Sequence, residues 1–432
     1  MKKTQQILRQ LRAHESRNVL FTEADGSWPI VWERARGVYV WDAEGKKYLD
    51  LTAAFGVASA GHANPRVVRA GQRQMATLLH AMGDVHPHAQ KAHLARELSR
   101  LTFERWSGGS TTGKVIYNNS GFEAVESALK TAILGTGKRG IIAFKGAYHG
   151  LGYGALNATH REHFRSAFRD QLGEFGQFAP FPAHDDELPK LEKELRSLFK
   201  KHAIGAILAE PAQARGGINV PPTEFLLLLR RLCDEHGALL ILDEIYTGFG
   251  RTGAWFACEH SSVMPDLICL GKALTGGFPL SACVGRADVM DAAWPASTGE
   301  AIHTSTFLGH PVGCAMALAQ IAEIRRLKLV ERSAKLGVTL LKLLRSVETV
   351  NPKLKMTARG VGLMTGLELR HRDNSPATTE SLAVIKRMLH HGFILLPEGE
   401  HGNIISLTPP LTIAERQLKK TVAALREELF RL

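Results

Sequence analysis

Short apolar runs recur through the middle of the chain, between about residues 65 and 319, and alternate with longer stretches in which apolar residues have helical spacing. A run that is apolar throughout is typical of a strand buried on both faces. Strands that alternate with helices predict a mostly parallel sheet covered by helices. The predicted strands are 115–117, 140–144, 206–209, 239–242, 267–270 and 281–284.

The two ends of the chain have a different pattern. Residues 30–51 alternate apolar and polar positions around glycine-containing turns, which predicts a small antiparallel meander. After Gly313 a long helical pattern continues to about Val347, and shorter elements follow it. These are segments at 362–369 and 404–408 and a helix near 383–390.

These patterns predict an α/β protein with two domains. Residues 65–319 would form the large domain around the mostly parallel sheet. Residues 1–64 and 320–432 would combine into a smaller α+β domain formed by both chain ends. A length of 432 residues fits this division, because it exceeds one ordinary hydrophobic core.

The composition is that of a globular protein, with 44% hydrophobic and 22% charged residues. The first residues lack an apolar signal core, and no stretch approaches the roughly 20 apolar residues that span a bilayer. We therefore expect a cytoplasmic protein without a membrane partner. The five cysteines show no CxxC spacing and no close pairing with histidine, which predicts reduced thiols and neither a metal site nor a disulfide framework.

The net charge of +12 raises the question of a nucleic-acid partner. The basic residues are spread along the chain, however, and short clusters such as Arg325-Arg326 lie in a helical pattern. We interpret the charge as a solvated basic surface that attracts anionic small molecules, and we expect no nucleic-acid partner.

Two charged residues follow two of the predicted strands. Asp243 ends the run 239–242, and Lys272 follows the run 267–270 at a distance of 29 residues (272 − 243). A carboxylate against the ring nitrogen of pyridoxal phosphate keeps that nitrogen protonated, and a lysine screened from water can bond to the cofactor's aldehyde as a Schiff base and then move protons. Each residue alone also fits an ordinary structural role, as a cap or as a solvated lysine.

The segments around both residues closely resemble the class III aminotransferases. These are fold-type I pyridoxal-phosphate enzymes that include ornithine, 4-aminobutyrate and other ω-amino acid transaminases. The resemblance extends over nearly the whole chain. It rests on residues 37–50 (GVYVWDAEGKKYLD), 61–65 (GHANP), 242–253 (LDEIYTGFGRTG), 271–282 (GKALTGGFPLSA) and 359–369 (RGVGLMTGLEL).

A phosphate site is predicted where the strand 115–117 leads through a Ser-Gly turn into an amphipathic helix, because the N-terminus of a helix attracts anions. Ser120 also fits the N-cap of that helix, and both roles are compatible. The resemblance implies that the backbone at Gly121 and Phe122 holds the phosphate. It also implies a homodimer in which Thr306 reaches the phosphate bound in the partner subunit.

The resemblance implies further cofactor contacts. Tyr148, which precedes His149, would stack on one face of the cofactor ring, and Ile245 would press on the other. Glu210 and Gln213 would lie near the ring edge. The full set of expected cofactor-binding residues is Ser120, Gly121, Phe122, Tyr148, His149, Glu210, Gln213, Asp243, Ile245, Tyr246, Lys272 and Thr306.

Three positions depart from the family pattern. Arg215 stands where many members have a glutamate, and Ser406 stands where many have the arginine that pairs with that glutamate and binds a substrate's α-carboxylate. We expect Arg215 to bind the carboxylate instead, since guanidinium offers a bidentate fork, or to be a surface residue after that function moved elsewhere. Tyr246 replaces a common glutamine, and its hydroxyl would bond to the cofactor's phenolic oxygen.

The resemblance thus implies a pyridoxal-phosphate-dependent aminotransferase that moves an amino group from an amine or ω-amino acid to a 2-oxo acid. Lys272 and Asp243 are the expected catalytic residues. The same scaffold also hosts aminomutases, decarboxylases and racemases. A further alternative, of a different class, is a non-catalytic nucleic-acid-binding protein that uses the charge of +12.

Overall fold

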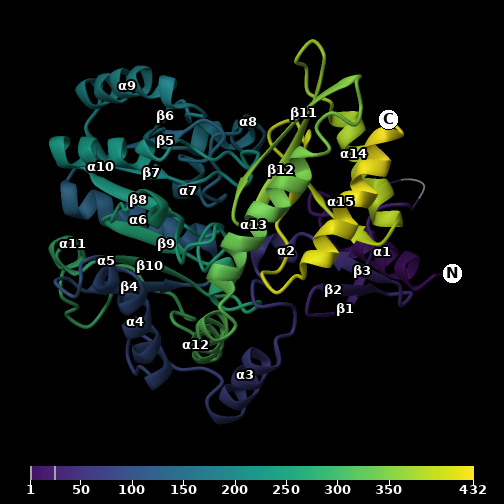
Figure 1. The fold of residues 1–432 in the computed structure, drawn as a ribbon. Helices are drawn as coiled ribbons and strands as arrows, with labels where there is room; N and C mark the ends of the chain where they lie inside the picture. Colours follow the sequence, from purple (N-terminus) through teal and green to yellow (C-terminus); the bar gives the residue numbers. More distant parts are fainter. Residues whose placement is uncertain (1, 24–25) are drawn as a thin grey trace.

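The large sheet is the centre of the molecule in the computed structural model, which describes residues 2–23 and 26–432. Its seven strands have the order β4-β10-β9-β8-β7-β5-β6 (Figure 1). Strand β10 is antiparallel to both of its neighbours, and the other neighbouring pairs are parallel. The strands are β4 (Gly113–Asn118), β5 (Gly140–Phe144), β6 (Gly176–Ala179), β7 (Ile204–Ala209), β8 (Leu239–Asp243), β9 (Leu267–Leu270) and β10 (Ser281–Arg286).

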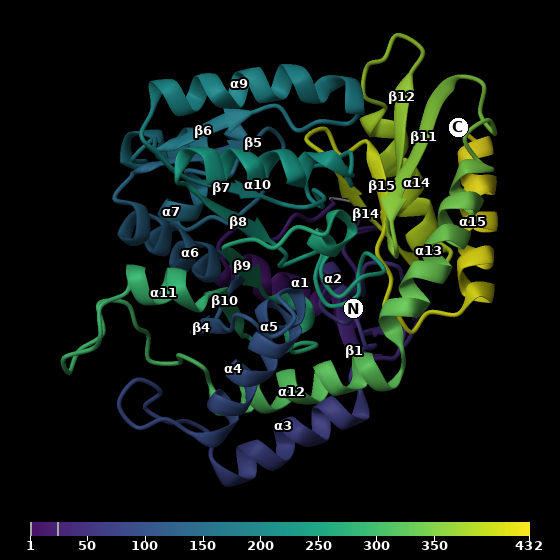
Figure 2. The same cartoon turned by 60° about the vertical axis from the view of Figure 1, so that its left-hand side comes forward.

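The strand side chains alternate between two hydrophobic cores, one on each face of the sheet. Ile142, Leu240 and Leu242 belong to the core that includes helix α10 (Glu224–His236). Ile141 and Ile241 belong to the core that includes helix α6 (Gly121–Thr136). Both faces are therefore buried, which explains why these strands are apolar throughout. The predicted α/β class with a mostly parallel, helix-covered sheet is confirmed (Figure 2).

All six predicted strands of this sheet are present, but β6 was not predicted. It is a four-residue edge strand, Gly-Gln-Phe-Ala, and three of its four residues are only partly buried. Such a segment lacks the continuous apolar run of a central strand.

The remaining strands form two four-stranded sheets. In the first, β13 pairs in parallel with β3, so that a strand from the C-terminal part joins the N-terminal meander. The second sheet, β11-β12-β15-β14, is antiparallel throughout. The strands are β1 (Trp32–Arg36), β2 (Tyr39–Asp42), β3 (Lys47–Asp50), β11 (Leu354–Val361), β12 (Met364–His371), β13 (Phe393–Ile394), β14 (Leu396–Glu398) and β15 (Ile404–Leu407). The domain boundaries after residues 64 and 319 stay a prediction.

The long helical pattern after Gly313 is two helices rather than one. Helix α12 ends at Arg326 and α13 begins at Leu329. Lys328 between them has φ +49°, and this left-handed conformation ends a right-handed helix.

The α-helices before the large sheet's β7 are α1 (Lys3–His14), α2 (Ala53–Gly56), α3 (Pro65–Thr77), α4 (Ala89–Leu101), α5 (Phe103–Trp106), α6, α7 (Tyr153–Leu156), α8 (Glu162–Arg165) and α9 (Leu188–Lys201). Those after it are α10, α11 (Ala287–Ala293), α12 (Pro311–Arg326), α13 (Leu329–Arg345), α14 (Thr378–His390) and α15 (Glu415–Phe430). Among the helices of residues 2–23 and 26–432, none is long and apolar enough to cross a membrane. The five cysteines are buried and unpaired.

Candidate active site

A cavity of about 410 Å³ lies at the edge of the large sheet where the parallel strands end. Its wall draws residues from the segments that follow β4, β5, β7, β8 and β9. Ligand sites of open α/β sheets form at the carboxyl ends of the strands. The lining residues are Gly121, Phe122, Tyr148, His149, Gly150, Leu151, Glu210, Ala214, Arg215, Asp243, Ile245, Tyr246 and Lys272.

The Asp243 carboxylate is fixed by its neighbours at the end of β8. Its Oδ2 lies 2.8 Å from Nδ1 of His149, and its Oδ1 accepts the N–H of Ile245 at 3.1 Å. Both side chains are buried. Because a carboxylate accepts, Nδ1 of His149 carries the proton. Nε2 of His149 is also buried, and it has no hydrogen-bond partner in the described part of the chain.

Lys272 is half-buried and lies just after β9, the strand next to β8. Burial lowers its pKa, while the charges of Asp243 and Glu210 oppose that shift. Its φ of +35° is unusual for a residue with a side chain, and such strain is characteristic of functional positions. Nζ lies 5.0 Å from the ring centroid of Tyr246. Lys272 thus combines an amine of lowered pKa with a strained backbone.

Glu210 connects two loops of the cavity wall. Its carboxylate accepts the N–H groups of Tyr148 and Ala214, both at 3.1 Å. Complete burial raises the pKa of Glu210 to about 7. This carboxyl group therefore fixes the loop of Tyr148 against the loop of Arg215.

The start of helix α6 forms the opposite end of the cavity. Glu123 accepts the N–H of Ser120 at 2.8 Å, as in a capping box, but the buried Ser120 hydroxyl has no partner among the residues described. A side chain at Gly121 would be crowded, because its Cβ would lie 3.1 Å from the Ile245 side chain. A hydroxyl without a partner beside the N-terminus of a helix favours the binding of an anion.

These groups fit pyridoxal phosphate. The N-terminus of α6 with the free Ser120 hydroxyl suits the phosphate, and the Asp243 carboxylate suits the ring nitrogen. The amine of Lys272 suits the aldehyde.

Tyr148 and Tyr246 occupy different parts of the wall. The half-buried ring of Tyr148 has the Arg215 guanidinium 5.6 Å from its centroid, and burial raises the pKa of its hydroxyl. Tyr246 is buried, which raises its pKa to about 12, and its hydroxyl lies 3.1 Å from that of Thr408. The Tyr246 hydroxyl is therefore already engaged by Thr408, in the segment that follows β15.

Four expected residues do not line the cavity, and one of them, Ser120, directly precedes the lining residue Gly121. Gln213 is buried behind it, where its amide donates to the Lys145 carbonyl at 2.8 Å and accepts from Asn219 at 2.9 Å. The Ser406 hydroxyl donates to the Leu396 carbonyl at 3.1 Å. Thr306 is exposed in the segment that precedes α12.

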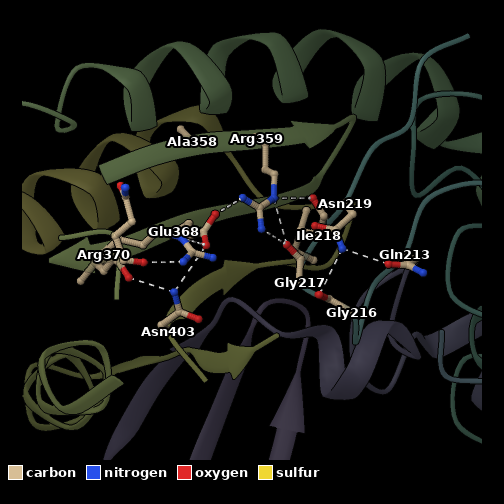
Figure 3. Close-up of polar contacts among 12 residues, drawn as sticks. Gln213, Gly216, Gly217, Ile218, Asn219, Ala358, Arg359, Glu368, Arg370 and Asn403 are labelled. Carbon is tan, nitrogen blue, oxygen red and sulfur yellow. Dashed lines mark hydrogen bonds and ion pairs between the residues drawn. The ribbon is translucent and has the colours of Figure 1, made fainter. Parts of the chain in front are cut away.

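The loop 213–219, which carries Arg215, is tied to the C-terminal sheet. Arg359 on β11 donates to the carbonyls of Gly217, at 2.7 Å and 3.1 Å, and Ile218, at 3.1 Å, and it pairs with Glu368 (Figure 3). Asn219 closes the loop by donating to Gln213 and to the Gly216 carbonyl at 3.1 Å. The position of Arg215 therefore depends on residues that lie far away in the sequence.

Glu398 and Arg161, which were not predicted, also lie at Arg215. Nε of Arg215 lies 3.8 Å from Oε2 of Glu398 on β14, and Arg161 donates to the Arg215 carbonyl at 3.0 Å. No local pattern marks Glu398, because its proximity to Arg215 results from the pairing of β14 with β15.

Comparisons with known proteins agree with this site. The family model of class III aminotransferases matches residues 21–429. The 5-aminovalerate aminotransferase DavT of Pseudomonas aeruginosa is 37% identical, with 92% of this chain and 93% of that protein covered. The acetylornithine aminotransferase of Methanopyrus kandleri is 35% identical, with 93% and 95% covered.

The fold agrees with a solved structure as well. A PLP-bound amine transaminase from an uncultivated Pseudomonas species superposes with a TM-score of 0.88 at 27% identity, over 97% of this chain and 98% of the other. The chain belongs to the class III aminotransferases, and it is a pyridoxal-phosphate-dependent enzyme that acts on an amine and a 2-oxo acid.

Proposed function

We propose that this class III aminotransferase takes the amino group from an ω-amino acid or a simple amine, with Lys272 as the residue that bonds to the cofactor and moves protons. One observation carries the proposal. Lys272 and Asp243 follow adjacent parallel strands and line one cavity together with the N-terminus of α6.

Pyridoxal phosphate supplies an aldehyde that bonds reversibly to amines and a ring that withdraws electrons from the neighbouring carbon. Asp243 would hold a proton at the ring nitrogen by ion pairing, and His149 keeps that carboxylate oriented through its 2.8 Å contact. Burial lowers the pKa of Lys272, which favours the neutral amine that would accept a proton from the substrate carbon and return it to another atom.

The other residues bind and orient. Gly121, Phe122 and Ser120 would hold the phosphate, and Tyr148 and Ile245 would enclose the ring. Glu210, whose pKa is about 7, would keep the two wall loops together and stay near the ring edge. Gln213 would act from behind the wall, where its amide supports the Arg215 loop.

A homodimer, with Thr306 completing the phosphate site of the partner subunit, is part of the proposal. The segment between α3 and α4 and the segment between α11 and α12, which both extend from the body of the molecule, support it (Figure 2). They contact one another through Thr304 and Asp84, at 2.6 Å, and through His80 and Phe307. Their exposed apolar side chains, which a partner subunit would cover, are Leu79, Met82, Val85, Ile302 and Phe307.

The choice of substrate rests on Arg215 and on the relatives. The relative named 5-aminovalerate aminotransferase supports an ω-amino acid donor. Arg215, at the cavity wall, would bind the carboxylate of the 2-oxo acid with its guanidinium fork. Ser406 lies beyond the wall, on β15, and would act only through its neighbours. A cytoplasmic location stays a prediction.

The visible absorbance of the holoenzyme tests the proposal. Single amines and amino acids are added one at a time without any 2-oxo acid. An ω-amino acid or amine should bleach the cofactor band once and stop, because the amino group stays on the enzyme until an oxo acid removes it. Continued turnover of one compound without bleaching would support an aminomutase instead, and no response to any amine would contradict the proposed donor class.

A further inference from the structure

His303 lies in the extended segment between α11 and α12, shortly before Thr306. From residue 295 to residue 307 every residue is exposed except Ala301 and His303, which are partly buried. The His303 ring packs against Trp294, with 5.8 Å between the ring centroids. His303 is therefore a point at which this exposed segment turns a side chain toward the body of the molecule.

The two ring nitrogens of His303 contact helix α6. Nε2 lies 2.9 Å from the hydroxyl oxygen of Ser127, and Nδ1 lies 3.1 Å from the ammonium of Lys130. The Ser127 hydroxyl has one proton, and oxygens of Asn118 and Glu123 lie at 3.1 Å and 3.0 Å to accept it. That hydroxyl can therefore accept a hydrogen bond from His303. An ammonium only donates, so Lys130 requires an unprotonated Nδ1, and the ring is neutral with its proton on Nε2.

The surroundings of His303 favour this neutral form. Burial lowers the pKa of the ring, and the charge of Lys130 lowers it further. The Glu123 carboxylate opposes the shift, but it also accepts the N–H groups of Asn119 and Ser120, both at 2.8 Å. A protonated ring would face the ammonium of Lys130 with a like charge, so the contacts with α6 depend on the neutral ring.

The two residues between this ring and Thr306 have partners as well. Thr304 donates to Asp84 at 2.6 Å, and Asn119, just before α6, donates to the Ser305 hydroxyl at 3.4 Å. Thr306 itself is exposed. The exposed threonine therefore follows three anchored residues, and two of them are anchored to α6 or to the residue that leads into it.

We propose that His303 is a positioning residue for the phosphate site of the partner subunit. Its neutral ring bridges Ser127 and Lys130 and holds the segment on α6 of its own subunit, with Thr306 directed outward. The hydroxyl then reaches the partner's phosphate without the entropic cost of ordering an exposed segment. This inference rests on the proposed function, in which Thr306 completes that phosphate site, and adds to it the residue that orients Thr306.

His303→Phe tests the proposal, since it keeps an aromatic ring and removes both nitrogens. The apoenzyme is titrated with pyridoxal phosphate and, separately, with pyridoxal, which lacks the phosphate. The dissociation constant of pyridoxal phosphate should rise about five- to thirtyfold, because a hydrogen bond to a charged group is weakened. The dissociation constant of pyridoxal should change by less than about twofold. The matched control is Glu300→Gln, an exposed residue of the same segment, which should change neither constant by more than about twofold.

Refolding H303F together with Lys272→Ala shows in which subunit His303 acts. In a mixed dimer, the site that keeps Lys272 receives Thr306 from the chain with an intact His303. Random pairing of equal amounts places about half of the Lys272-containing sites in mixed dimers, so about half should regain wild-type affinity for pyridoxal phosphate. The absence of this tight class would show that His303 acts only within its own subunit, which overturns the proposal. An equal loss of affinity for both ligands, or no loss for either, overturns it as well.

Lys130→Met provides a second test on an exposed residue, whose replacement spares the core. The affinity for pyridoxal phosphate should fall about two- to threefold, because one of the two contacts of the ring is lost. In an H303F background the same change should have no further effect, and a persistent loss would show that Lys130 acts through its charge and not through His303. Should H303F fail to fold, K130M must itself show the phosphate-specific loss and the recovery in mixed dimers with K272A.

Failure of the proposed function is distinguishable from failure of this inference. A Thr306→Val variant with unchanged affinity for pyridoxal phosphate contradicts the proposed role of Thr306 and, with it, that of His303. A T306V variant that loses this affinity and recovers it in mixed dimers, beside an H303F variant that does neither, contradicts the role of His303 alone.

Discussion

At the scale of single residues, Asp243 and Lys272 line the same cavity, and each interacts with its own neighbours. Asp243 is satisfied by His149 and by a backbone N–H, so its carboxylate does not need Lys272 as a partner. Burial meanwhile lowers the pKa of Lys272. The surroundings of Lys272 therefore favour its neutral form more than water does, which suits the proposed bond to the cofactor.

Asp243→Asn removes the charge and keeps the shape. We expect the single-turnover rate with an amine donor to fall by roughly a hundredfold or more, because the ring nitrogen loses the carboxylate that keeps it protonated. Stopped-flow absorbance measures that rate at saturating cofactor. A variant that binds the cofactor and reacts at the wild-type rate would contradict the role of Asp243.

The apolar runs before Lys272 and Asp243 predicted two buried strands, and both residues line the same cavity, while their catalytic roles stay a prediction. The sequence identified Arg215, because it stands where many members of the family have a glutamate. It did not identify the partner of Arg215, Glu398. Glu398 belongs to a three-residue strand, and its proximity to Arg215 results from pairing across the C-terminal sheet. Contacts of this kind join residues that are distant in sequence, so local patterns do not contain them.

At the scale of elements, short loops are held by side chains from other parts of the molecule. Arg359 on β11 holds the loop 213–219 through two carbonyls. Glu244 at the end of β8 accepts the N–H groups of Ala257, at 2.9 Å, and Cys258, at 2.8 Å. Both contacts connect a wall of the cavity to a more distant element.

Arg359→Lys should weaken the support of Arg215. A lysine cannot bridge Glu368 and two carbonyls at once, because it lacks the planar fork. We expect the KM for the 2-oxo acid to rise by about three- to tenfold with the kcat of a small amine donor nearly unchanged. Arg370→Lys is the matched control, since Arg370 pairs with the same Glu368 without contacting the loop (Figure 3). Equal effects of both variants would show that only general stability is involved.

Glu244 gives the stability of the protein a defined pH dependence. Burial raises its pKa from the ordinary value of 4.5 to about 7, so the folded state binds this proton more tightly than the unfolded state does. The contribution of Glu244 to the free energy of unfolding therefore falls as the pH rises from about 5 to 7, by at most about 3 kcal/mol, and is constant above that range.

Glu244→Gln removes this titration. Denaturant unfolding at several pH values should show that the stability difference between wild type and E244Q changes between pH 5 and 7 in favour of the variant as the pH rises. The variant also loses one of the two carboxylate oxygens that accept the N–H groups of Ala257 and Cys258, and this loss shifts the stability of the variant by the same amount at every pH. Parallel stability curves would contradict the raised pKa.

At the scale of the whole molecule, the sheet and its burial were the most predictable features. Strands buried on both faces leave continuous apolar runs in the sequence, and all six runs are strands. The edge strand β6 and the break at Lys328 were not predicted. Strand β6 is only partly buried, so it has no continuous apolar run. Lys328 is a single residue in a left-handed conformation within an otherwise helical pattern.

A dimer with shared active sites predicts complementation between two defective variants. Lys272→Ala and Thr306→Val are unfolded and refolded together. A mixed dimer would contain one site that lacks both residues and one intact site, so the mixture should recover about a quarter of wild-type activity. No recovery beyond the two variants alone would show that Thr306 does not act across the interface, and a monomeric mass by sedimentation would contradict the dimer.

The central claim is that Lys272 bonds to the cofactor. Holoenzyme is reduced with borohydride, digested and mapped by mass spectrometry, with Lys272→Ala as the control. We predict a pyridoxyl adduct on the peptide that contains Lys272 and no adduct in the variant. An adduct on a different lysine, or an equal adduct in the variant, would contradict the account of this site.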